Sequence, residues 1–166
     1  YMPGEGGNQM LDTTTTFVAD KWYHVVGAWD GTTQKLYLDG KLEAEAALTG
    51  TINTDAHPLT LGAYYDGPAS LFKGNIARAS VWNVALTPKQ IRTMMFTDWA
   101  TMAADTDNFT SANCVAWYEF NDSVEGTTIS DMSGSGNTGT MQPDNGGWAN
   151  AGTFTEGTST VKMVGT

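Results

Sequence analysis

Hydrophobic and polar residues alternate through the first half of the chain, and turn residues break the alternation about every ten positions. The segment from Trp22 to Asp30 alternates, residues 30–33 carry a turn signal, and Gln34 to Leu38 alternates again. This pattern predicts a β-hairpin, because successive side chains of a strand point to opposite faces of the sheet. A third strand is expected from Leu42 to Ala46, with its glutamates on a solvated outer face.

Several further short segments, each bounded by turn residues, are expected to form strands. They run from Thr14 to Val18, Leu59 to Gly62, Gly74 to Trp82, Cys114 to Phe120, Thr127 to Ser130, Thr138 to Met141 and near Thr160 to Val164. Turn signals at this spacing are typical of an all-β sandwich.

One helix interrupts the strand pattern. Thr87 offers an N-cap hydroxyl, Pro88 suits the first helical position and Gln90 stands where a capping box needs it. These residues predict a short helix from Pro88 to about Phe96. Residues 99–113 are polar and are interpreted as a linker rather than as part of the core.

The order of these motifs resembles a known family. Trp22 to Gly27, Leu36 to Lys41, Leu59 to Gly62 and Val81 to Thr87 are similar to the central hairpin, closing strand and helix of laminin-G-like, concanavalin-A-like domains. The resemblance covers about Phe17 to Phe96. It implies an all-β, two-sheet antiparallel jelly-roll β-sandwich with one short helix.

A second similarity to this family lies at 115–120 and 131–140. The opening strands of such a domain are absent before Tyr1, so residues 1–98 are interpreted as an N-terminally incomplete laminin-G-like domain. We expect residues 114–166 to complete this sandwich or a neighbouring one, because an incomplete sandwich exposes unpaired backbone groups and an apolar face. The protein is therefore expected to be part of a larger chain or an oligomeric assembly.

The composition limits which binding partners and which cellular locations are expected for the protein. Eight basic residues against eighteen acidic ones give a formal net charge of −10, which disfavours nucleic acid and anionic membranes. No apolar run of membrane-spanning length occurs, so no membrane insertion is expected. The lone Cys114 precedes an apolar run and is interpreted as a buried, inert thiol rather than a reactive one. We expect an extracellular, cell-surface or virion-surface location.

The resemblance includes glycosidases, which place paired carboxylates on alternate residues of one strand. No Glu-x-Asp-x-Glu run occurs here, and Glu43 and Glu45 alternate with alanines on an expected solvated face. His24 and His57 are not near a nucleophile motif, and packing is the expected role of His24. The chain is therefore not expected to be an enzyme.

Calcium is the expected cofactor if there is one. Asp131, Ser133 and Ser135 put oxygen atoms at alternate positions, and Asp122 is an additional candidate ligand. The twelfth position of the loop is Gln142 rather than a bidentate Glu. A plain Asx or Ser turn is therefore the alternative.

Sugar binding needs an aromatic face beside hydrogen-bonding groups. Tyr64, Tyr65 and Asp66 fit that description in one loop, and Trp148 with Asn150 forms a second patch. Four other tryptophans, Trp22, Trp29, Trp82 and Trp117, are placed on strands and are expected in the core.

These features predict a non-catalytic recognition module that binds carbohydrate or a surface protein. The alternative is a structural subunit, such as a capsid decoration, a fibre or an extracellular filament component, that contacts only its neighbours. Ordinary loop packing is the alternative for both aromatic patches.

Overall fold

The computed structural model describes residues 10–52, 58–63, 71–120, 127–142, 147–150 and 160–165. The elements along the chain are β1 (Tyr23–Trp29), β2 (Thr33–Leu38), β3 (Lys41–Ala47), β4 (Thr60–Leu61), β5 (Ile76–Trp82), α1 (Pro88–Met94), α2 (Trp99–Ala104), the 3-10 helix η1 (Ser111–Asn113), β6 (Cys114–Tyr118), β7 (Thr128–Ile129), β8 (Gly139–Gln142), β9 (Gly147–Asn150) and β10 (Thr160–Gly165).

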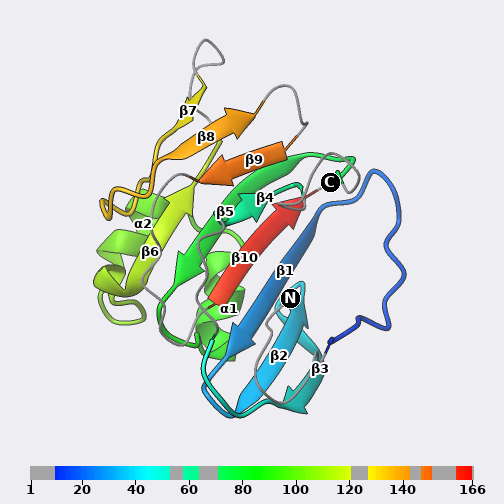
Figure 1. Ribbon diagram of the computed structural model, residues 1–166. Coiled ribbons are helices and arrows are strands. Elements are labelled where there is room, and N and C mark those ends of the chain that lie inside the picture. Colours follow the sequence, from blue (N-terminus) through cyan, green and yellow to red (C-terminus); the bar gives the residue numbers. More distant parts are fainter. Residues whose placement is uncertain are drawn as a thin grey trace.

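The strands of the described residues form two antiparallel sheets (Figure 1). The six-stranded sheet has the order β3-β2-β1-β10-β5-β6, and the four-stranded sheet has the order β4-β9-β8-β7. The protein is therefore mostly β, as the turn spacing predicted. Strands from the last third of the chain belong to both sheets. In particular, β10 lies between β1 and β5, and β6 pairs with β5.

One cluster of buried residues lies where the four-stranded sheet meets β5 and β6. Leu61 and Ile129 come from the four-stranded sheet, and Val81, Ala116 and Tyr118 come from the six-stranded sheet. Their side chains are apolar or aromatic, and they alternate with residues that face the opposite side, as strand geometry requires. The two sheets are thus held together by an apolar interface over β5 and β6.

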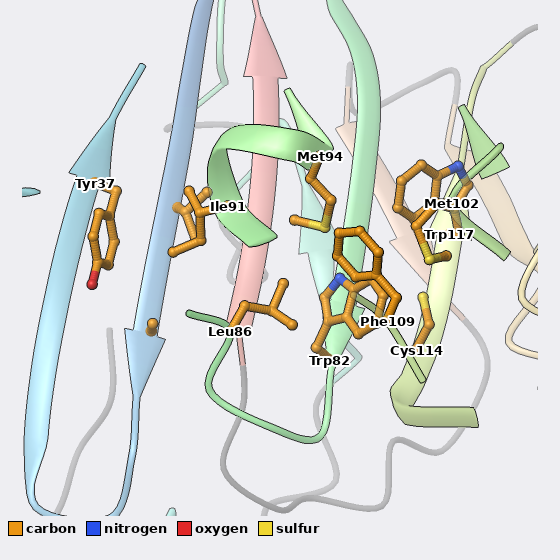
Figure 2. Packing of buried hydrophobic residues seen from close by; sticks show 11 residues of the cluster. Tyr37, Trp82, Leu86, Ile91, Met94, Met102, Phe109, Cys114 and Trp117 are labelled. Atoms are coloured by element: carbon orange, nitrogen blue, oxygen red, sulfur yellow. The ribbon is translucent and has the colours of Figure 1, made fainter. Parts of the chain in front are cut away.

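The second and larger cluster lies on the opposite face of the six-stranded sheet, under the helices (Figure 2). Ile91 and Met94 of α1 pack there with Trp82 and Trp117 from the strands. The capping box that the sequence predicted forms as expected. The Thr87 hydroxyl accepts from the Gln90 backbone N–H, and the Gln90 side chain accepts from the Thr87 backbone N–H. The prediction of α1 is confirmed.

The expectation that residues 99–113 lie outside the core is wrong. This segment contains α2, and its Met102 is completely buried and its Phe109 nearly so. The expectation of one short helix is corrected at the same point, since the described residues contain α1, α2 and η1. The polar residues from Asp105 to Asn113 hid this helix from sequence reasoning, because the strands beneath the segment decide which of its side chains are buried.

Residue Glu119, next to β6, holds α2 in place. Its Oε1 atom accepts hydrogen bonds from the Trp99 backbone N–H at 2.6 Å and from the Trp117 indole N–H at 2.9 Å. The helix itself begins after the N-cap Asp98, whose carboxylate accepts from the Thr101 N–H at 2.8 Å. The carboxylate of Glu119 therefore joins the first turn of α2 to the sheet.

The turn between β2 and β3 packs directly against α1. Asp39 and Gly40 both have positive φ, at 49° and 74°. A Cβ atom on Gly40 would lie 2.6 Å from Cγ of Arg92. Asp39 also accepts a hydrogen bond through Oδ1 from the His24 backbone N–H at 2.8 Å, so this hairpin end is tied to both β1 and α1.

Three other expectations need correction. The segment from Thr14 to Val18 is not a strand. Trp22, expected in the core, is 48% exposed because it precedes β1 rather than lying in it. Glu43 does not face solvent, because hydroxyl groups of the chain before β1 cover its carboxylate.

Candidate functional site

The predicted glycan-binding loop leaves the four-stranded sheet at the end of β4. Tyr64, Tyr65 and Asp66 lie outside the described residues, but both ends of the loop are described. Ala63 and Leu71 form an antiparallel bridge, and the Phe72 backbone N–H donates to the Gly62 carbonyl at 2.8 Å. Gly62 has φ of 78°, which side-chain-bearing residues rarely adopt. The two ends of the loop are therefore clamped together beside β4.

Apolar side chains are exposed at this clamp. Phe72 is 51% exposed and Leu71 is 36% exposed. β4 is an edge strand of the four-stranded sheet among the described residues, so the clamp lies at one edge of that sheet. A half-exposed aromatic ring beside a polar loop is typical of surfaces that contact a sugar or another protein.

The second predicted patch lies on the strand next to β4. Trp148 and Asn150 were expected in a loop, but they belong to β9, which pairs with β4 and β8. Trp148 is opposite Leu61 at the end of β4, one residue before the clamped loop begins. The sequence did not reveal this, since Gly146-Gly147-Trp148 has no strand pattern and the pairing joins segments about 90 residues apart.

The pairing register of β9 shows which residues lie opposite Trp148 and Asn150. Trp148 is opposite both Leu61, which belongs to the cluster between the sheets, and Met141, which packs against that cluster. Asn150 is opposite Gly139, where an added Cβ atom would contact Ile129 and Tyr118. The structure thus places Trp148 and Asn150 on β9, between β4 and β8, and their role in binding stays a prediction.

The predicted calcium loop is ordered by hydrogen bonds within the chain. Oδ1 of Asp131 accepts from the backbone N–H groups of Trp117 at 3.0 Å and Ser133 at 2.9 Å, and Oδ2 accepts from the Asn137 N–H at 2.9 Å. The Ser133 bond is the Asx turn considered as the alternative. Ser135 donates through its hydroxyl to the Cys114 carbonyl at 3.2 Å.

A calcium ion at Asp131 would compete with three N–H donors for the same two oxygen atoms. Asp122 lies outside the described residues. Within the part of the chain that the structure describes, no three His, Cys, Asp or Glu side chains gather as a metal site would need. Calcium binding by Asp131, Ser133, Ser135 and Asp122 stays a prediction, and titration calorimetry with calcium tests it.

Glu43 forms a contact that the sequence did not predict. Its Oε2 atom accepts from the hydroxyl groups of Thr13 at 3.2 Å, Thr14 at 3.4 Å and Thr15 at 3.0 Å, and only 7% of the side chain is exposed. The Thr15 hydrogen bond is the main cause that lowers the pKa of Glu43. We call residues 13–15 with Glu43 the threonine clasp, which holds the chain before β1 against edge strand β3.

Two further residues considered for chemistry, His24 and Cys114, are buried. His24 is buried within β1, and His57 lies outside the described residues. Burial raises the pKa of the Cys114 thiol, with a smaller contribution from the Asp131 charge. Cys114 is thus a buried thiol, as expected. No helix in the described segments is long and apolar enough to cross a membrane.

The described residues thus form a mostly β module of two antiparallel sheets with few short helices. The family model Laminin_G_3, described as "Concanavalin A-like lectin/glucanases superfamily", matches residues 1–92. The chain belongs to this family. The prediction of the family from its hairpin motifs is confirmed.

Comparison with curated proteins gives one further likeness. "Sushi, von Willebrand factor type A, EGF and pentraxin domain-containing protein 1" of Rattus norvegicus is 26% identical over 124 residues. The match covers 68% of this chain and 3% of that protein, so the chain spans a small part of its relative. No solved structure matches the chain.

Proposed function

We propose that this protein is a non-catalytic, extracellular recognition module that binds carbohydrate or a surface protein through the loop at the end of β4. The exposed Phe72 and Leu71 beside the clamp carry this proposal. The clamp fixes the two ends of the loop, so binding by Tyr64 and Tyr65 would cost less ordering entropy than binding by a free loop. The family and the domain names in the curated relative support an extracellular location.

A screen against immobilised glycans and candidate surface proteins tests the proposal. We expect a ligand that loses most of its affinity in Tyr64→Ala/Tyr65→Ala and loses part of it in Phe72→Ala. Phe96→Ala is the matched control, because Phe96 is 86% exposed at the end of α1, on a different sheet face. Equal losses in the control and the loop variants would contradict binding at this edge, as would hydrolysis of a bound glycan that ends on replacing Glu119.

The alternative role, a structural subunit, predicts a different behaviour in solution. A chain that shares strands with its neighbours forms oligomers, whereas a recognition module of this kind is expected to stay monomeric by light scattering. Removing residues 114–166 cannot separate the two roles, because this deletion removes β10 from the centre of the six-stranded sheet. The measurement must therefore use the full chain, with and without calcium.

A further inference from the structure

The loop between β7 and β8, residues 131–137, lies along the free side of β6 (Figure 1). β6 is the last strand of the six-stranded sheet, and its other side is paired with β5. An edge strand leaves a row of N–H and C=O groups that can pair with another chain unless something covers them. The loop supplies that cover.

The loop satisfies four backbone groups on the free side of β6. Asp131 accepts from the Trp117 N–H at 3.0 Å, and the Met132 backbone N–H donates to the Trp117 carbonyl at 2.8 Å. Ser133 and Asn137 both donate to the Val115 carbonyl, at 3.3 Å and 2.8 Å, and Ser135 donates to the Cys114 carbonyl at 3.2 Å. Mostly side chains thus make the bonds that a neighbouring strand would make.

The same residues hold the loop in shape. Asp131 also accepts from the backbone N–H groups of Ser133 and Asn137, so one carboxylate joins both ends of the loop to β6. The Tyr118 hydroxyl donates to the Asn137 carbonyl, and Asn137 is buried. Removing the Asp131 carboxylate would therefore release the loop as well as the Trp117 N–H.

The two edges of this sheet differ in how they are protected. β3, at the other edge, carries Lys41, Glu43 and Glu45, and charged residues oppose pairing with a like strand. β6 has the sequence Cys-Val-Ala-Trp-Tyr, without a charge and rich in residues that favour strands. Without the loop, nothing in the strand itself would oppose pairing with a second β6, and antiparallel pairing of two identical edges satisfies two-fold symmetry.

We propose that residues 131–137 form a side-chain cap that closes the β6 edge, and that this edge pairs with the β6 edge of a second copy of the chain once the cap is lost. The motif Asp131-x-Ser133-x-Ser135-x-Asn137 serves this purpose through the spacing of its side chains along β6. The inference does not depend on the ligand of the β4 loop.

The test compares Asp131→Ala with Asp30→Ala. Asp30 is a matched control because its carboxylate also accepts three hydrogen bonds, all through Oδ1 from Thr32 and Thr33, in the turn between β1 and β2 rather than at the β6 edge. Mass is measured by sedimentation over a range of concentrations, and exchange of the Trp117 amide hydrogen is followed in the same samples. A second variant, Ser133→Ala/Ser135→Ala, removes two cap bonds and keeps the carboxylate.

We expect Asp131→Ala to form dimers as concentration rises, while wild type and Asp30→Ala keep one mass. At low concentration its Trp117 amide should exchange about tenfold faster than in wild type, and dimerisation should slow it again. If Asp131→Ala does not fold, the double serine variant must show the same two changes. Unchanged mass, equal association of the Asp30 control, or dimers in which the Trp117 amide stays fast would each overturn the proposal.

Discussion

Replacing Met102 by alanine tests the finding that residues 99–113 belong to the core. Met102 has no exposed surface and packs in the cluster beneath the helices. The change removes three heavy atoms, worth about 2 kcal/mol of lost transfer free energy, and the cavity raises the total to about 3 kcal/mol. For a chain of this size, that loss corresponds to a melting temperature lower by roughly 6–12 °C.

The assay is urea unfolding followed by tryptophan fluorescence, since Trp82 and Trp117 are buried in the same cluster. Met10→Ala is the matched control because Met10 is 75% exposed, and its loss should cost less than about 0.5 kcal/mol. If Met102→Ala unfolds at the same urea concentration as Met10→Ala, the segment is not part of the core and the reasoning fails.

Three further predictions follow from single contacts. The pKa of Glu43 in the folded protein lies below its ordinary 4.5, so the threonine clasp should add stability at neutral pH that is lost as the pH falls through this folded-state pKa. Glu43→Gln should weaken the acid dependence of the melting temperature. An unchanged pH profile in this variant would count against the clasp. The Cys114 thiol should resist an aromatic disulfide reagent in the folded protein and react fully in denaturant, whereas fast native reaction would mean that it is accessible. Gly40→Ala should cost roughly 1–3 kcal/mol in urea unfolding, because it combines a positive φ with a short contact to Arg92, and a neutral result would place the hairpin away from α1.

The sequence alone was enough for the central hairpin, for α1 and for the family. The alternation from Trp22 to Leu38, the Asp39-Gly40 turn and the Thr87 capping box each depend on residues close together in the chain, so local pattern indicates them correctly. The short motifs around the hairpin were likewise enough to indicate the family that the comparison shows.

Tertiary structure decided the features that join distant segments. Only the folded chain places β10 between β1 and β5, puts Trp148 on a strand beside β4, and buries Met102 against the sheet. The folded chain also gives Asp131 its partners on β6. The Asp-x-Ser-x-Ser pattern could not decide this, because it suits a cation loop as well as an edge cap. Local spacing fixes which atoms a loop can offer, whereas the strand that lies beside the loop decides which of those atoms are already bonded.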